Sequence, residues 1–191
     1  MTTPTAGPGT APAVTPAVTP PTPDRAAAVA LCAHTVRLMA EGDLRDFEAV
    51  VHPRAHNREA ASEPPACRGT GPAALHASAL WLRAAFADLR WEVHETAADG
   101  DLVVLRTTMS GRQTGTFVVH GADGRPERAF PATGRAFAVA QTHWFRLAGG
   151  LVVEHWADRD DLGQAAQLGW APPGPRYAVR VLLATRRARR R

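Results

Sequence analysis

The second half of the chain alternates apolar and polar residues, which predicts a run of antiparallel strands. Apolar side chains recur at alternate positions between Arg135 and Leu147, and again between Leu151 and Asp158. A two-residue period places successive side chains on opposite faces of a strand. With Ala148-Gly149-Gly150 as a three-residue loop, the two segments form a hairpin in which Leu147 lies opposite Leu151.

Polar side chains interrupt the apolar face of this predicted hairpin. Gln141 and His143 share that face with Leu147. The predicted register sets His143 opposite His155, and by the same register Gln141 lies opposite Ala157. A buried polar side chain needs a partner, so one interpretation is a core with a few satisfied polar groups. Three polar side chains gathered on one apolar wall favour the other interpretation, a ligand pocket.

Spacings of three and four residues between apolar side chains predict helices in the first half of the chain. Asp24 is suited to cap a helix that ends at Gly42, and Asp43 is suited to cap a second, shorter helix. A third helix is predicted over residues 72–88, because it begins with a proline. Residues 52–71, rich in proline, alanine and polar residues, are predicted to form a loop.

After the third predicted helix the apolar period changes to that of strands. Asp99-Gly100 is a strong hairpin turn, and residues 107–115 are expected to fray or bulge. Asp160 or Asp161 is expected to cap a short helix that ends at Gly169. Helices followed by antiparallel strands are typical of an α+β domain with helices on one face of a curved sheet. Such a sheet and its helices are expected to enclose a cone-shaped pocket.

Composition divides the chain into three parts. Residues 1–23 hold almost no large side chains and are predicted to be a disordered tail, residues 24–170 form the domain, and residues 171–191 form an Arg-rich tail. The formal net charge is +4, and it falls to −2 without the six arginines from Arg180 to Arg191. A nearly neutral domain argues against a nucleic-acid partner.

Cysteine usage and hydropathy bear on compartment and on bound metal. Cys32 and Cys67 are the two cysteines of the chain, so no disulfide framework is expected. No apolar run approaches the length of a membrane span and no secretory signal pattern is present, so we expect a cytoplasmic protein without membrane contact. His143 and His155 lack a convergent third ligand in any zinc-binding spacing, so no metal ion is expected.

Several fixed residues resemble those of one known family. Trp91, Asp99-Gly100-Asp101 and the segment from Gly149 to Trp156, followed by an Asp and by Gln-Leu-Gly, are similar to the SnoaL-like polyketide (ester) cyclases. The resemblance covers roughly residues 25–170. It implies the nuclear transport factor 2-like fold and a cofactor-free enzyme that closes a ring in a hydrophobic polyketide ester. The implied reaction is an intramolecular aldol condensation with general acid/base catalysis.

The resemblance also assigns residues, and one assignment fails. The family's pocket histidine matches His143, but the position of its acid/base aspartate, fourteen residues further on, is Ala157. Asp158 is adjacent, yet in a regular strand it faces the opposite side and serves only if a bulge turns it inward. The alternative is a structural role for three aspartates, which cap the terminal helix and pair with Arg159: Asp158, Asp160 and Asp161. The proposed catalytic residues are His143, His155 and Asp158; those proposed to bind substrate are His56, Asn57, Trp81, Met109, Gln141 and Asp161.

Two further hypotheses concern function and assembly. Ala157 makes a non-catalytic ligand-binding or dimerisation module of the same fold the rival to the cyclase. Ketosteroid-isomerase-like chemistry has less support, because it relies on a pocket tyrosine and Tyr177 lies beyond the domain. Trp144 and Trp156 share the outer face of the hairpin, which favours burial against a second subunit in a homo-oligomer.

Overall fold

The computed structural model describes residues 24–190; the segment predicted to be a disordered N-terminal tail lies outside this range. Two of its elements, η1 and η2, are short 3₁₀ helices. The chain order is α1 (Arg25–Glu41), α2 (Leu44–Val50), β1 (Val51–Asn57), η1 (Arg58–Ser62), η2 (Pro65–Arg68), α3 (Gly71–Ala85), β2 (Phe86–Asp99), β3 (Leu102–Gln113), β4 (Phe117–His120), β5 (Pro126–Phe130), β6 (Ala136–Ala148), β7 (Leu151–Arg159), α4 (Asp161–Leu168) and α5 (Pro175–Ala188).

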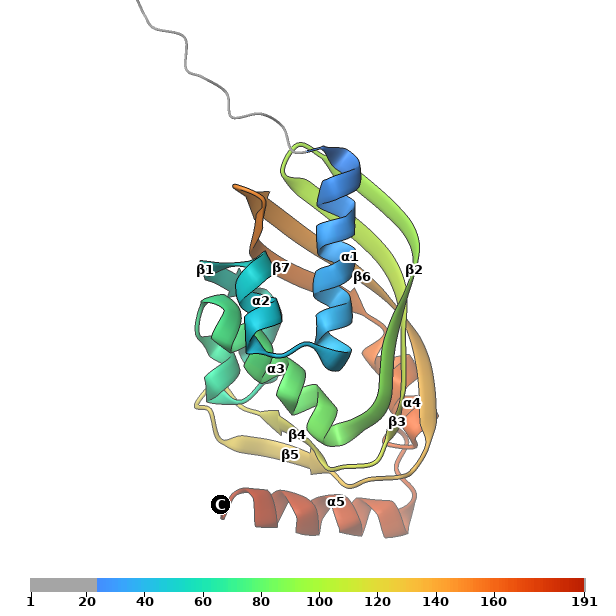
Figure 1. The fold of residues 1–191 in the computed structure, drawn as a ribbon. Helices are drawn as coiled ribbons and strands as arrows, with labels where there is room; N and C mark the ends of the chain where they lie inside the picture. Colours follow the sequence, from blue (N-terminus) through green and yellow to red (C-terminus); the bar gives the residue numbers. More distant parts are fainter. Residues whose placement is uncertain (1–23, 191) are drawn as a thin grey trace, which may run out of the picture.

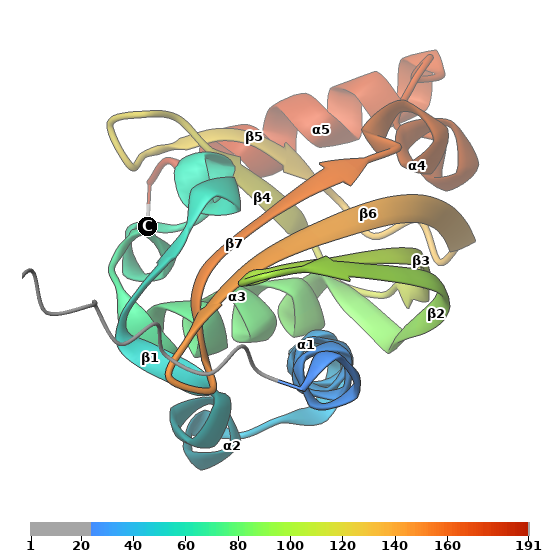
Figure 2. The same ribbon diagram turned by 90° about the horizontal axis from the view of Figure 1, so that it is seen from above.

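Five strands form one curved sheet in the order β1-β7-β6-β3-β2. Neighbouring strands from β7 to β2 pair antiparallel, and β1 pairs parallel with β7. The sheet bends around α1 and α3, as the two views of the ribbon show (Figures 1 and 2). The separate β4–β5 hairpin lies across the lower end in Figure 1. The predicted α+β class with a curved antiparallel sheet is confirmed.

Helix ends follow the predicted capping residues. The Asp24 carboxylate accepts from the backbone N–H of Ala26 at the start of α1, which ends at Gly42. Asp43 and Asp46 form a reciprocal capping box at the start of α2. Asp160 caps α4, which ends at Gly169 in the left-handed region, at a φ of 72°. These predicted boundaries are confirmed; α3, however, ends at Ala85 and leads directly into β2.

The segment predicted to be a loop over residues 52–71 contains β1, η1 and η2, so that prediction is wrong. β1 was not predicted from the sequence because it is an edge strand that contains Pro53 and has no alternation of apolar residues. Its parallel pairing sets Val51 opposite Val152 and Asn57 opposite His155, with an irregularity between them. The predicted fraying of residues 107–115 is likewise wrong up to Gln113, because β3 stays paired with β2 and β6 there.

The β6–β7 hairpin differs from the predicted register. Its loop is Gly149-Gly150, and a bulge between the Arg146 and Leu147 pairings leaves one extra residue in β7. As a result His143 lies opposite Ala157, and Phe145, not His143, lies opposite His155. Beyond the bulge the displacement is two residues, an even number, so His155 keeps its predicted face although its predicted partner is wrong. Next to the turn the displacement is one residue: Leu147 lies opposite Val152, which takes the inward position predicted for Leu151.

The core lies between the concave face of the sheet and α1. Cys32 and Val36 of α1 pack in one buried cluster with Val103, Leu105 and Phe145 of the sheet. Burial raises the pKa of the Cys32 thiol to about 12, so this side chain behaves as a small hydrophobe. Both cysteines of the chain are buried, free thiols.

The Arg-rich segment predicted to be a tail contains α5, which lies along the β4–β5 hairpin (Figure 1). Tyr177 Oη donates to the carbonyl of Pro131 at 3.0 Å, and Thr185 Oγ1 accepts from the backbone N–H of Ala129 at 2.9 Å. These side chains recur at helical spacing on the face toward β5, which explains the packing. Within residues 24–190, no helix combines the length and apolar character that crossing a membrane requires.

Candidate functional site

A cavity of about 370 Å³ lies between the concave face of the sheet and the helices. Most of its wall is apolar, and aromatic rings close one end. The ring centroids of Phe130 and Trp170 lie 4.4 Å apart, and those of Phe117 and Trp170 lie 5.4 Å apart. An apolar cavity with a few polar groups is the usual form of a small-molecule site.

Five polar side chains form one hydrogen-bonded chain along the wall that β6 and β7 provide. Trp91 Nε1 and His143 Nε2 each lie 2.9 Å from Gln141 Oε1. His143 Nδ1 lies 3.0 Å from His155 Nε2. At the far end His155 Nδ1 lies 3.0 Å from the Asn57 side chain of β1. The two-residue side-chain period of strands puts the β6 and β7 residues on the same face. The parallel pairing of β1 with β7 adds Asn57.

The number of available protons limits which groups donate in this hydrogen-bonded chain. Two neutral imidazoles carry two N–H groups, whereas the rings make three contacts. Gln141 Oε1 already accepts from Trp91, so His143 Nε2 is a donor to it. Asn57 Oδ1, which also accepts from the backbone N–H of Glu59 at 3.3 Å, is the acceptor for His155 Nδ1–H. Each ring nitrogen therefore has a partner within 3.0 Å in the wall, and the contact between the two rings is left without a proton in the neutral state.

Burial keeps both imidazoles uncharged. It lowers the pKa of His143 to about 4, and the positive charge of Arg159 acts in the same direction. The pKa of His155 is also lowered well below its usual range, first by burial and then by the neighbouring His143 and Arg159. At neutral pH the pair is therefore neutral, and its N–H groups act as hydrogen-bond donors.

Three carboxylates line the cavity, and each has a different environment. Asp161 lies at the rim with a side chain that is 72 % exposed. Glu59 binds Arg159 at 3.1 Å through Oε2 and accepts from the backbone N–H of Ala157 at 3.1 Å through Oε1. Glu63, in the turn between η1 and η2, is only 4 % exposed and accepts from the Ser78 hydroxyl through Oε2.

The structure brings together most of the residues that the sequence indicated. Met109 contacts Gln141 Nε2 through its sulfur at 3.1 Å, and Trp81 donates from Nε1 to the carbonyl of Val118 at 2.9 Å. Predicted site residues that line the cavity are Asn57, Trp81, Met109, Gln141, His143, His155 and Asp161.

Two predicted site residues lie elsewhere. His56 is exposed, because it alternates with the inward-facing Asn57 along β1. Asp158 is exposed on the outer face of β7, where its Oδ2 accepts from Trp144 Nε1 at 2.9 Å. No bulge turns this carboxylate inward, so Asp158 does not replace the carboxylate that is missing at Ala157.

Sequence reasoning missed Glu59, Glu63 and Ser78. The two glutamates lie in the segment predicted to be a loop, where no apolar period marks an inward-facing position. Ser78 lies on the predicted third helix, at three residues from Leu75 and four from Leu82, which was the available signal that it shares their inward face. Trp91 and Gln141 were both singled out from the sequence, but not as partners of each other.

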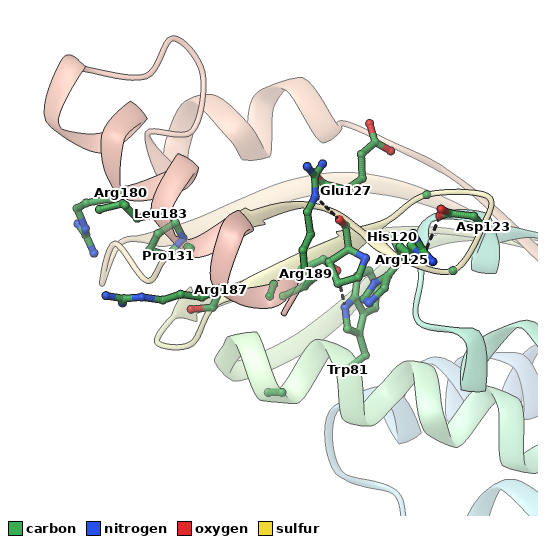
Figure 3. A pocket seen from close by; sticks show the side chains of 18 residues that line it. Trp81, His120, Asp123, Arg125, Glu127, Pro131, Arg180, Leu183, Arg187 and Arg189 are labelled. Carbon is green, nitrogen blue, oxygen red and sulfur yellow. Dashed lines mark hydrogen bonds between the residues drawn. The ribbon is translucent and has the colours of Figure 1, made fainter. Parts of the chain in front are cut away.

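A second, open hollow of about 1620 Å³ lies between α5 and the β4–β5 hairpin (Figure 3). Its arginines are largely occupied with backbone: Arg180 Nη2 donates to the carbonyl of Ala132 at 3.0 Å, and Arg189 donates to the carbonyls of Pro126 and Glu127 at 3.0 Å each. These contacts attach α5 to the hairpin. The cavity between the sheet and the helices, with its perturbed titratable groups, is therefore the candidate active site.

Metal binding has no support in the described part of the chain. Across residues 24–190, no group of three or more His, Cys, Asp or Glu side chains is arranged to hold a metal ion.

Comparison with known proteins identifies the family. The model of the SnoaL-like polyketide cyclases matches residues 30–168. The chain belongs to this family. Aklanonic acid methyl ester cyclase DnrD of Streptomyces peucetius is 32 % identical over 145 residues, which are 73 % of this chain and 92 % of that protein.

Solved structures of the family agree with the fold. TsrD from Streptomyces laurentii matches with a TM-score of 0.62 and 31 % identity, over 76 % of this chain and 97 % of that one. A SnoaL-like polyketide cyclase from Agrobacterium tumefaciens, 14 % identical with a TM-score of 0.54, shares the fold over 74 % of this chain and 95 % of that one. The family resemblance and the fold that it implied are thus confirmed, and α5 lies beyond the residues that the family model matches.

Proposed function

We propose that this member of the SnoaL-like family is an ester or polyketide cyclase. It closes a ring by cofactor-free, acid/base-catalysed intramolecular aldol chemistry on an apolar small molecule that carries carbonyl groups. The observation that carries the proposal is the hydrogen-bonded imidazole pair in the wall of a largely apolar cavity. A relative that is a methyl ester cyclase supports the reaction class.

His143 is the proposed donor to the substrate oxygen. Ring closure passes through an enolate, whose negative oxygen needs a hydrogen bond in the cavity. His143 Nε2–H can be shared between Gln141 Oε1 and that oxygen, because Gln141 Oε1 keeps a second donor, Trp91 Nε1–H. A neutral imidazole can act as such a donor when its environment prevents protonation.

His155 and Asn57 are proposed to position His143. His155 Nε2 lies 3.0 Å from His143 Nδ1, and Gln141 Oε1 holds the proton of His143 on Nε2. Asn57 Oδ1 accepts from His155 Nδ1–H and orients that ring from β1. Trp81, Met109 and the aromatic end of the cavity are proposed to contact the apolar body of the substrate.

A second candidate function is a non-catalytic binding module of the same fold. Ala157 favours it, because this residue lines the cavity at the position where the family resemblance places an acid/base aspartate. The same proposal includes a cytoplasmic location and a homo-oligomer assembled through the outer face that carries Trp144 and Trp156.

His143→Ala separates the two candidates. With aklanonic acid methyl ester as the probe, we expect kcat to fall by about 10²–10³-fold with the probe's Kd changed by less than about threefold. The matched control is Trp144→Phe, one residue away on the outer face, which should keep the parent kcat. A parent protein that binds the probe without converting it supports the binding module.

A further inference from the structure

The cavity contains a carboxylate that compensates for Ala157. Every ring nitrogen of the imidazole pair already lies within 3.0 Å of a partner in the wall, so the ring nitrogens point at those partners and not at a carbon of the substrate. The other groups able to take a proton are the three carboxylates that line the cavity, Glu59, Glu63 and Asp161.

Two of these carboxylates are poor candidates for a base. Glu59 is neutralised by Arg159 and holds the Ala157 N–H, so both of its oxygens are occupied. Asp161 is largely exposed at the rim of the cavity and pairs with Arg159 at 3.7 Å, so its carboxylate is occupied by water and by a cation.

We propose that Glu63 is the catalytic base of this cavity, in the role that the missing aspartate leaves open at Ala157. The proposal rests on the cyclase function proposed above. Glu63 is buried in the cavity wall, and none of the ion pairs found within residues 24–190 includes it. It reaches the cavity from the turn between η1 and η2, on a different element from the imidazole chain.

The surroundings of Glu63 hold it in one orientation. The Ser78 hydroxyl on α3 donates to Oε2, and the Cys67 thiol is a second hydrogen-bond partner of the carboxylate. Arg68 Nε donates to the backbone carbonyl of Glu63 at 3.0 Å, and the same guanidinium donates to the carbonyl of Gly121 at 2.7 Å. The turn is thus tied to both α3 and the segment that follows β4, which is the rigidity that a positioned base requires.

Burial makes the Glu63 carboxylate more basic than usual. Burial raises its pKa, and the negative charge of Glu59 adds to this effect. The Ser78 hydroxyl, the positive charge of Arg159 and the Cys67 thiol oppose the rise without cancelling it. A carboxylate whose pKa is shifted toward working pH is a better general base.

The proposed step balances within the cavity. The Glu63 carboxylate takes the proton from the carbon next to a substrate carbonyl, and His143 Nε2–H holds the enolate oxygen. The enolate carbon then bonds to a second carbonyl carbon of the same molecule, whose C=O π bond becomes an alkoxide. Protonated Glu63 returns its proton to that alkoxide. The product is an isomer of the substrate, and the enzyme ends in its starting state.

Glu63→Gln tests the proposal, because the amide keeps the shape and can still accept from Ser78. With aklanonic acid methyl ester as the probe, we expect kcat to fall at least about 100-fold while Kd changes by less than about threefold. Glu48→Gln on the exposed side of α2 is the matched control and should keep the parent rate. Glu63→Gln turnover within threefold of the parent overturns the assignment, whereas no turnover by the parent overturns the cyclase proposal itself.

The pH profile gives a readout that a merely structural role does not produce. Parent kcat should rise with pH through the raised pKa of Glu63, and the residual rate of Glu63→Gln should lack that rise. Ser78→Ala removes a hydrogen bond to the carboxylate, so the midpoint of the rise should move to higher pH. A midpoint that stays in place in Ser78→Ala, with the variant folded, contradicts Glu63 as the base.

Discussion

The two faces of the β6–β7 hairpin carry opposite chemistry although their residues alternate along the same strands. On the inner face Gln141, His143 and His155 form a buried polar chain. On the outer face Trp144 and Trp156 stack with their ring centroids 6.0 Å apart and their planes at 4°. Three polar side chains thus point into the protein among apolar neighbours, and two large aromatic ones point outward.

The difference shows that the hydrogen-bonding and stacking partners of a side chain decide whether it is tolerated on a given face of the sheet. The inner polar groups are tolerated because each finds a hydrogen-bond partner, which removes the main cost of burial. The outer tryptophans cover each other, the Arg58 guanidinium lies 4.6 Å from the Trp156 ring centroid, and Asp158 accepts the Trp144 N–H. Removing partners from one face, with neighbouring residues of the other face as controls, therefore tests the comparison.

The largest effect on stability is expected from Gln141→Leu. The substitution leaves the N–H groups of Trp91 and His143 buried without an acceptor, and each such group costs about 1–3 kcal/mol. We expect the free energy of unfolding, measured in urea, to fall by about 3 kcal/mol. Thr142→Val, the next residue on the outer face, should change it by less than about 0.5 kcal/mol. Equal losses in the two variants contradict the comparison.

A pH-dependent loss of stability should follow from the inner imidazoles. Because the folded pKa of His143 is lowered to about 4, the unfolded chain binds a proton first as the pH falls below the ordinary value of about 6.5. Stability is therefore kept above that value and lost between about pH 6.5 and pH 4, by up to about 3 kcal/mol for this group, and His155 acts in the same direction.

Urea unfolding at several pH values checks this loss. His143→Gln should flatten the dependence, since the variant has one fewer buried group to protonate on unfolding. His34→Gln, at an exposed position of α1, is the control and should keep the parent slope. A parent protein that is equally stable at pH 4.5 and pH 7 contradicts neutral, buried imidazoles.

The smallest effect is expected from Asp158→Asn. This side chain lies outside the cavity and an asparagine oxygen can still accept from Trp144, so kcat should stay within about twofold of the parent and stability within about 0.5 kcal/mol. Steady-state kinetics with the same ester probe check the first expectation. A loss of turnover comparable to that of His143→Ala would restore Asp158 as a catalytic residue.

Local patterns were enough to predict much of the fold. The two-residue period from Phe137 to Leu147 follows from strand geometry, and the aspartates at positions 24, 43 and 160 cap helices because their carboxylates satisfy free N–H groups. β1 was missed because a short parallel edge strand has no period of its own and is recognisable only from the β7 residues that it pairs with.

The candidate site was predictable to the extent that it depends on which face of its strand each residue occupies. The shared face of Gln141, His143 and His155 survived an error of two residues in the register, since an even displacement keeps every side chain on its face. The partners were not predictable: Asn57 reaches His155 across 98 positions of sequence, and Glu63 lies in a segment without any apolar period.

By itself the sequence determined which residues face the same way, because backbone geometry fixes the side-chain period of a strand or helix. It also determined the family and the absence of an aspartate at position 157. Tertiary structure alone decided that Asn57 and Trp91 complete the imidazole chain. It also decided that Glu63, among the three carboxylates that line the cavity, takes part in none of the ion pairs found within residues 24–190. These outcomes depend on which distant segments pack together, since burial and charge pairing are properties of the folded neighbourhood and not of any local pattern.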